Sequence, residues 1–248
     1  MNTKKRFGLV GKNISYSFSK AYFSNKFEKL ALHNHSYENF DLENIHDFPE
    51  IFKGDSAGLI GLNVTIPYKE KVAEYLDAID EDAATIGAIN TIKMEASGRK
   101  VGYNTDVYGF KNSLLPLLQP HHKKALILGT GGASKAVAFA LDQLGVSYVF
   151  VSRTPGLGQL SYKDLNAELM EIHHILVNCS PLGTSPNTAL CPEIPYASLT
   201  EKHLLYDLIY NPAETTFLRR GKEQGASIKN GLEMLELQAE KSWEIWND

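Results

Sequence analysis

The feature that most constrains this sequence is a glycine-rich turn between an apolar run and a helical pattern near the middle of the chain. Residues 124–128 have the composition of a buried parallel strand, and Gly129-Thr130-Gly131-Gly132-Ala133 follows without a break. Residues 136–144 then predict a helix that ends at Gly145. Strand, turn and helix in direct succession are the building unit of an α/β fold with a parallel sheet.

The turn is suited to holding an anion. Gly129 allows a tight turn, Gly131 lets the backbone approach a pyrophosphate, and the start of the helix offers unpaired N–H groups and a positive dipole end. Ser134 stands where a third glycine is usual. Because such turns are also ordinary α/β architecture, other residues must support a dinucleotide site. Roughly half of the chain precedes the turn, and we expect a substrate domain there.

Composition excludes several classes of partner. The formal net charge of −4, without a long basic run, argues against binding to nucleic acid or to an anionic membrane surface. No apolar segment approaches the length that spans a membrane. The only two cysteines, Cys179 and Cys191, lack metal-ligand spacing and suit a reducing compartment. We therefore expect a cytoplasmic monomer or homodimer that binds a small molecule and no metal.

Polar residues gather where a strand of the first half is expected to end. Residues 57–65 read as a buried strand, and a helix is predicted over residues 68–76. Thr65 and Lys69, with Asn63, would then lie where open α/β sheets bind ligands. A lone lysine is more often solvated, but a cation at the amino end of a helix is disfavoured by the dipole and so requires a reason.

A pair of serines precedes the helix predicted over residues 20–32. Either serine could simply cap that helix. Ser17 and Ser19 alternate, however, and alternate hydroxyls in an extended turn point the same way, which suits a polyhydroxylated ligand.

An aspartate has two interpretations. Asp106 follows a strand predicted over residues 100–103 and could act only as the cap of a helix over residues 107–118. In the functional interpretation it converges with Lys69, holds the ammonium group in place and sets its pKa.

The end of the next predicted strand bears on the choice of cofactor. Residues 147–151 are followed by Ser152-Arg153-Thr154. NAD enzymes usually carry an acid at this point to bind the ribose hydroxyls, and none is present here. Arg153 could be an exposed loop arginine, but it can also pair with a ribose phosphate. The sequence therefore favours NADP over NAD.

The complete pattern predicts an α/β protein with two domains. Residues 1–105 are expected to form an N-terminal α/β substrate domain. Residues 106–231 are expected to form a Rossmann-type NADP domain with a doubly wound parallel sheet, beginning with a linking helix over residues 106–118. The final helix, residues 232–248, is expected to pack back toward the N-terminal domain and to belong to it.

Seven motifs together resemble shikimate dehydrogenase, and the resemblance runs through nearly the whole chain. They are Ser17-Phe18-Ser19, Asn63-Val64-Thr65-Ile66-Pro67-Tyr68-Lys69, Gly87-Ala88-Ile89-Asn90-Thr91, Asn104-Thr105-Asp106, Gly129-Thr130-Gly131-Gly132-Ala133, Ser152-Arg153-Thr154, and Asn230-Gly231-Leu232-Glu233-Met234-Leu235 with Gln238. Any one motif is weak, but seven in the order of the family are highly specific.

The resemblance implies the reversible, NADP-dependent reduction of 3-dehydroshikimate to shikimate, a step toward chorismate and the aromatic amino acids. It implies that Lys69 exchanges a proton with the reacting oxygen and that Asp106 lies beside it. The substrate would be held by Ser17, Ser19, Thr65, Asn90, Asp106, Tyr210 and Gln238. The cofactor would be bound by Gly129, Thr130, Gly131, Gly132, Ala133, Ser152, Arg153, Thr154, Leu208, Gly231 and Glu81.

This chain departs from the family pattern at three positions, and two other functions remain open. Tyr16 and Lys20 stand where the family commonly has histidine and proline, and Ser152 replaces an asparagine. One alternative is a shikimate or quinate dehydrogenase that accepts NAD, in which Arg153 would not be decisive. The other is a non-catalytic ligand-binding protein on the same fold, which would need neither Lys69 nor Asp106.

Overall fold

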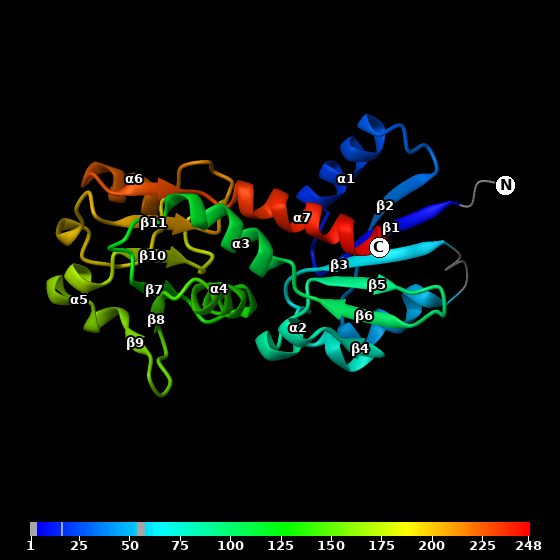
Figure 1. The fold of residues 1–248 in the computed structure, drawn as a ribbon, viewed down its shortest axis with the longest axis horizontal. Coiled ribbons are helices and arrows are strands. Elements are labelled where there is room, and N and C mark those ends of the chain that lie inside the picture. Colours follow the sequence, from blue (N-terminus) through cyan, green and yellow to red (C-terminus); the bar gives the residue numbers. More distant parts are fainter. Residues whose placement is uncertain (1–3, 16, 54–57) are drawn as a thin grey trace. The chain divides into compact units, whose positions relative to one another are not determined.

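The computed structural model describes residues 4–15, 17–53 and 58–248. The chain forms two compact units, one made of Met1–Thr105 with Ala239–Asp248 and the other of Asp106–Gln238 (Figure 1). Each unit is built on its own sheet. The α/β fold class predicted from the sequence is confirmed.

The first unit contains a mixed sheet with the strand order β2-β1-β3-β5-β6-β4. β1 pairs in parallel with β2 and β3, and β5 is antiparallel to β3 and β6. The bounds are β1 Lys5–Gly11, β2 His35–Asp41, β3 Leu59–Val64, β4 Ala78–Ile79, β5 Thr91–Met94 and β6 Lys100–Tyr103.

Helices cover both faces of this sheet because the strand side chains alternate between the faces. Phe7 and Leu9 of β1 pack with α1 and the last part of α7, whereas Val10 packs with the 3-10 helices η1 and η2. The helix bounds are α1 Phe18–Lys29, η1 Ile45–Phe52, η2 Val72–Tyr75, α2 Glu81–Ile86 and α7 Leu232–Asn247.

The end of α7 completes the core of the first unit. The indole of Trp246 packs against the rings of Phe7 and Phe23 and donates a hydrogen bond to the Ile92 carbonyl at 3.0 Å. A Cβ atom on Gly61 would lie 2.1 Å from the Trp246 Nε1, so only glycine leaves room for the indole against β3. The expected packing of the C-terminal helix on the N-terminal domain is therefore found for residues 239–248.

The second unit contains a sheet in which every paired strand is parallel, in the order β12-β11-β10-β7-β8-β9. The order reverses between β7 and β10, which makes this a doubly wound Rossmann-type sheet as predicted. The bounds are β7 Lys124–Leu128, β8 Ser147–Ser152, β9 Leu160–Ser161, β10 Ile175–Asn178, β11 Leu204–Asp207 and β12 Ser227–Lys229.

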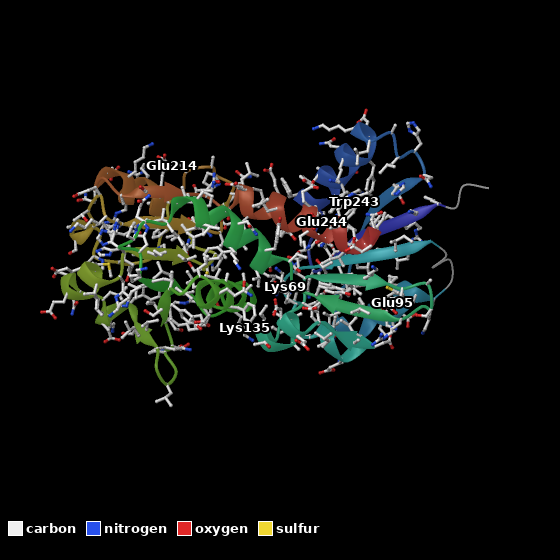
Figure 2. The ribbon with its side chains drawn as sticks, viewed as in Figure 1. Lys69, Glu95, Lys135, Glu214, Trp243 and Glu244 are labelled. Carbon is white, nitrogen blue, oxygen red and sulfur yellow. The ribbon has the colours of Figure 1, made fainter. Side chains whose placement is uncertain are left out.

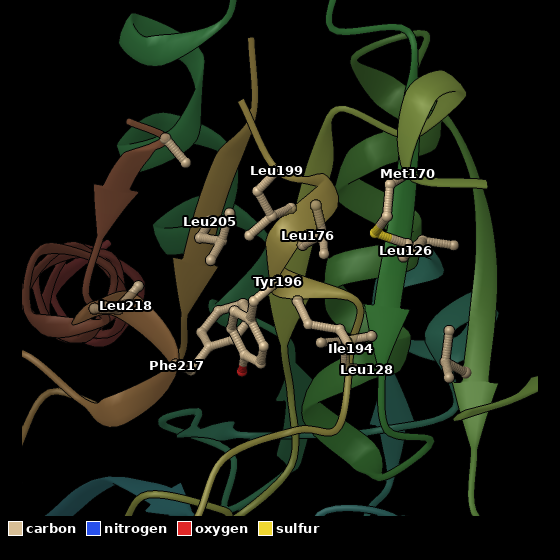
Figure 3. Packing of buried hydrophobic residues seen from close by; sticks show 12 residues of the cluster. Leu126, Leu128, Met170, Leu176, Ile194, Tyr196, Leu199, Leu205, Phe217 and Leu218 are labelled. Carbon is tan, nitrogen blue, oxygen red and sulfur yellow. The ribbon is translucent and has the colours of Figure 1, made fainter. Parts of the chain in front are cut away.

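One face of this parallel sheet carries a cluster of buried apolar residues. Leu126, Leu176 and Leu205, from three adjacent strands, pack with Met170 of α5 and Phe217 of α6 (Figure 3). On the opposite face Tyr206 packs edge-on against Phe110 of α3. The helix bounds are α3 Asp106–Leu114, η3 Leu115–Leu117, α4 Gly132–Gln143, η4 Tyr162–Asp164, α5 Ala167–Ile172, η5 Tyr196–Ser198 and α6 Thr216–Glu223.

The helix predicted over residues 68–76 is wrong. The chain there makes turns and then the short η2, and the Lys69 carbonyl accepts a hydrogen bond from the Ile89 N–H at 2.7 Å. This bond to a distant segment takes the place of one to a residue further along a helix. The dipole argument for Lys69 therefore does not apply, because no α-helix begins there. No helix in the described part of the chain is long and apolar enough to span a membrane.

Candidate functional site

The glycine-rich turn connects β7 to α4 as predicted. Gly129 has φ +115°, a conformation open to glycine, and a Cβ atom there would lie 3.2 Å from the backbone of Cys179. Around Gly131 there is open space for a Cβ atom, so a ligand can approach its backbone. The helix begins at Gly132, earlier than the predicted Ala136. The turn therefore presents the amino end of a helix of three turns to any bound anion.

Ser134 takes over the position of the usual third glycine without opening the structure. It is fully buried, and its hydroxyl donates a hydrogen bond to the Gly131 carbonyl at 2.6 Å. A small side chain that folds back on the turn thus keeps α4 close to the sheet.

The ends of four neighbouring strands place the predicted cofactor residues along one edge. Leu128, Val151, Asn178 and Asp207 lie at the same level of the sheet register. Because all four strands run in parallel, the next residue along each of them also lies at this edge: Gly129, Ser152, Cys179 and Leu208. Open α/β sheets bind ligands outside the carboxyl ends of their strands, at the point where strand order reverses.

Leu208 and Gly231 are brought together at this edge. A Cβ atom on Gly231 would lie 2.1 Å from the Leu208 carbonyl oxygen, and the Gly231 N–H donates to the Ile209 carbonyl at 3.1 Å. The absence of a side chain at Gly231 therefore allows the close approach. Their contact with a nicotinamide stays a prediction.

The end of β8 supplies the cation that was expected. Ser152 is buried and accepts a hydrogen bond from the Thr154 N–H at 3.2 Å, while Arg153 and Thr154 are exposed. The residues fit a dinucleotide with a ribose phosphate, because a glycine turn at a helix start is joined by an exposed guanidinium at the neighbouring strand end.

Lys69 lies in the turn that follows β3 and is half-buried (labelled in Figure 2). Its carbonyl accepts a hydrogen bond from the Ile89 N–H, and Asn90 comes next along the chain after Ile89. The Val64 N–H in turn donates to the Asn90 carbonyl at 2.8 Å. The end of β3, with Thr65 and Lys69, is therefore connected directly to the start of β5, with Asn90.

The serine pair lies at the start of α1, and its two members differ. Ser17 occupies the cap position, but its side chain makes no capping hydrogen bond with the described residues. The Ser19 side chain lies near the hydroxyl of Tyr37 and opposes the rise that burial causes in the pKa of Tyr37. Tyr16, one of the departures from the family pattern, lies outside the described residues.

A buried polar network links these positions in the first unit. Tyr37 donates to the Asn63 side-chain oxygen at 2.8 Å, and the Asn63 amide nitrogen reaches Ser242 at 3.0 Å. The Asn90 side-chain oxygen accepts from the Thr105 N–H at 2.7 Å. Asn63, Asn90, Thr105 and Ser242 are all less than 5% exposed. Their role with substrate stays a prediction, but the network brings Tyr37, Asn63 and Asn90 into one hydrogen-bonded assembly.

The remaining predicted substrate residues belong to the second unit. Asp106 opens α3 and is 6% exposed, and Gln238 lies on α7 with its amide donating to the Leu235 carbonyl at 3.0 Å. A Cβ atom on Gly109 would lie 3.2 Å from the Gln238 Cβ, so α3 and α7 touch at this level. Tyr210 is 36% exposed in the loop after β11. The pairing of Asp106 with Lys69 stays a prediction.

Glu81 is an exposed residue at the start of α2. Its carbonyl accepts a hydrogen bond from the Thr85 hydroxyl at 2.9 Å. Its assignment to the cofactor stays a prediction. Among the described residues, no group of three or more His, Cys, Asp or Glu is placed to hold a metal ion.

The sequence interpretation missed Asp207, Tyr37 and Ser242. Asp207 is fully buried at the end of β11, where it accepts from Asn178, Thr215 and the Ile209 N–H at 3.0, 2.6 and 3.0 Å. Burial raises its pKa to about 6, against the effect of these hydrogen bonds. An acid at the end of an apolar strand, and a serine on the apolar face of a helix, were the available signals.

Comparison with known proteins agrees with this arrangement. The family model for the shikimate dehydrogenase substrate binding domain matches residues 9–92. A shikimate dehydrogenase (NADP+) from Carboxydothermus hydrogenoformans is 38% identical over 255 residues, which cover 96% of this chain and 90% of the relative.

Solved structures match both units. A shikimate dehydrogenase in complex with NADP+ is 34% identical and has a TM-score of 0.86, with 98% of this chain and 90% of that chain covered. The enzyme from Thermus thermophilus, in complex with NADP(H) and shikimate, is 31% identical and has a TM-score of 0.84, with 98% and 93% covered. Given this identity over nearly its whole length, the chain belongs to the shikimate dehydrogenase family.

Proposed function

We propose that this chain catalyses the reversible reduction of 3-dehydroshikimate to shikimate with NADPH, with Lys69 as the catalytic residue. The reaction is that of the relatives, whose curated members are named shikimate dehydrogenase (NADP+). The observation that carries the proposal is the hydrogen bond from the Ile89 N–H to the Lys69 carbonyl, which holds Lys69 beside Asn90 at one end of the first sheet. The second sheet of the same chain has the parallel strand ends and glycine-rich turn that suit a dinucleotide.

NADP(H) would be held at the carboxyl edge of the second sheet. The N–H groups from Gly129 to Ala133 would bind the pyrophosphate, and Ser152, Arg153 and Thr154 would bind the ribose phosphate. Leu208 and Gly231 would border the nicotinamide. When bound, the cofactor supplies or accepts the hydride.

The chain's own residues would orient the substrate and move one proton. Ser17, Ser19, Thr65, Asn90, Tyr210 and Gln238 would hold the hydroxyls and the carboxylate. The Lys69 ammonium would donate a proton to the ketone oxygen as the carbon is reduced, and in the reverse direction the neutral Lys69 amine would take a proton from the alcohol. Asp106 would fix the position of the ammonium group.

The test is the loss of NADPH absorbance when purified protein is mixed with 3-dehydroshikimate, beside parallel reactions with NADH and with dehydroquinate. Fast loss that needs NADPH and 3-dehydroshikimate supports the proposal. Equal loss with NADH or with dehydroquinate favours a broader shikimate or quinate dehydrogenase. Folded protein that is inactive with every pair contradicts the proposal and favours a ligand-binding protein.

We further propose a cytoplasmic location and a monomeric or homodimeric state. The location is supported by the two cysteines, which are free thiols as a reducing compartment favours. Cell fractionation tests the location, and the molecular mass from small-angle scattering tests the oligomeric state.

A further inference from the structure

The hydroxyl of Ser242 lies at the centre of the buried network of the first unit. It is 3.0 Å from the Asn63 Nδ2, 2.7 Å from the Thr91 Oγ1 and 3.2 Å from the Thr105 Oγ1, and its residue is fully buried. These three partners belong to the segments that end β3, begin β5 and follow β6. A single hydroxyl therefore joins three separate segments of the sheet edge to α7.

Two routes lead from Ser242 into the network, one to the predicted substrate residue Asn90 and one to Tyr37. On one side Thr91 contacts the Asn90 side-chain oxygen at 3.1 Å, which also accepts from Thr105. This oxygen is thereby fixed toward the protein, and the amide nitrogen donates to the Thr105 Oγ1 at 3.0 Å. In the proposed function, a contact of Asn90 with a ligand oxygen would be made by the second N–H of this nitrogen. Ser242 thus acts on the orientation of the Asn90 amide.

On the other side the route passes through Asn63. Its amide nitrogen lies 3.0 Å from Ser242 but 3.3 Å from both the Asn90 carbonyl and the Thr91 hydroxyl. Its oxygen accepts from Tyr37. The Ser242 contact is the shortest of the three, so it fixes the Asn63 amide that in turn orders Tyr37.

We propose that Ser242 is a positioning residue that holds Asn90 in the geometry for binding the substrate, without touching the substrate itself. The inference rests on the proposed function, in which Asn90 contacts the substrate. Because this contact would be made to a part of the substrate that does not react, its loss weakens the binding of the ground state and the binding of the transition state equally. Loss of the hydroxyl therefore raises KM and leaves kcat unchanged.

The test compares Ser242→Ala and Ser242→Cys with the wild type. The alanine variant removes the hydroxyl, and the cysteine variant keeps the volume with a poor hydrogen-bonding group, so that a cavity is distinguished from a lost hydrogen bond. Both are expected to raise the KM for shikimate about fivefold, the loss expected for one hydrogen bond, with kcat and the KM for NADP+ within about twofold of the wild type. Shikimate binding measured by calorimetry is expected to weaken by the same factor.

The matched control is Ser113→Ala. Ser113 is 1% exposed, and its hydroxyl lies 2.6 Å from that of Tyr206 in the second unit. This variant also loses buried hydrogen bonds and thermal stability, but it is expected to keep the wild-type KM for shikimate. An equal rise in KM in Ser113→Ala would mean a general loss of structure and would overturn the positioning role.

The outcomes separate the two proposals. Wild-type protein that reduces 3-dehydroshikimate while both Ser242 variants keep its KM would overturn the positioning role alone. A fall in kcat with an unchanged KM would also overturn it. Wild-type protein that neither turns over nor binds shikimate would overturn the proposed function, and the role of Ser242 with it.

Discussion

The backbone of Lys69 is held by Ile89: the Ile89 N–H donates to the Lys69 carbonyl at 2.7 Å. This contact fixes the main chain at Lys69 beside the start of β5, independently of the lysine side chain. A variant that changes only the side chain therefore keeps the local scaffold, and its kinetics report the chemistry of the amine.

Replacing Lys69 with alanine is expected to lower kcat by a factor of about 10² to 10⁴, the usual contribution of a positioned proton donor. The KM for shikimate should change little, because the hydroxyl-binding residues remain. Steady-state kinetics with NADP+ and shikimate measure both. Lys71→Ala is the control, since Lys71 is an exposed lysine two residues further along. Turnover of Lys69→Ala within tenfold of the wild type, about 10 % of kcat or more, would contradict the assignment of the catalytic residue.

Replacing Arg153 with alanine is expected to raise the KM for NADPH by a factor of about 10 to 100, since a hydrogen bond to a charged group contributes roughly 1.5–3 kcal/mol. The KM for NADH should stay the same, because NADH lacks the 2′-phosphate on the adenosine ribose. Arg219→Ala is the control: Arg219 is an exposed arginine of the same unit that pairs with Glu223 at 2.7 Å. An equal rise in the KM for NADPH and the KM for NADH would show that Arg153 does not bind the 2′-phosphate.

Asp207 gives the stability of the protein a measurable dependence on pH. Its pKa is raised from 3.8 to about 6 in the folded protein, so the folded state holds a proton that the unfolded state has released. Stability therefore falls as the pH rises from about 4 to 6, by about 3 kcal/mol from this residue.

Asp207→Asn should remove that contribution, because the amide oxygen still accepts from Ile209 and carries no charge. Urea unfolding at a series of pH values between 4 and 7 measures the difference between the two proteins. A difference that stays constant over this range would show that the Asp207 carboxyl is not perturbed.

His122 should act in the opposite direction. Its Nδ1 accepts from the Gln119 N–H at 2.9 Å, and its Nε2 lies 3.1 Å from the Lys202 carbonyl, which identifies a neutral ring that donates from Nε2. Burial lowers its pKa below 6.5, and nearby histidines add to the effect, so the neutral form is favoured in the folded state. The stability from this residue is present above pH 6.5 and is lost as the pH falls through the lowered pKa.

His122→Asn keeps an acceptor for Gln119 and should flatten the stability curve between pH 7 and 5. Thermal unfolding across this range is the measurement, and exposed His33, replaced in the same way, is the control. A wild-type curve no steeper than that of His122→Asn would contradict the neutral ring.

The parts of the fold that the sequence predicted are those that local pattern determines. The turn from Gly129 to Ala133 followed from an apolar run, glycines and a helical pattern within one short stretch. The helix expected after Lys69 was wrong because the partner of the Lys69 carbonyl is Ile89, which no local pattern could indicate.

The buried polar residues show the same limit. Ser242 and Asn63 are 179 positions apart, and Asp207 and Asn178 are 29 apart, yet each pair forms a hydrogen bond. A serine among apolar helix residues and an acid after an apolar strand indicate only that a partner is needed. The partner's identity depends on the complete fold, so these members of the site could not be assigned from the sequence.

The contact of Trp246 with Gly61 has a consequence for the order of folding during synthesis. The core of the first unit needs residues 239–248, but these are synthesised only after the whole of the second unit. During synthesis on the ribosome, Phe7 and Phe23 lack their contacts with the Trp246 indole until this last segment has been made. The second unit, whose residues 106–238 are continuous in the sequence, can complete its sheet first, and the first-made half of the protein is the last to close.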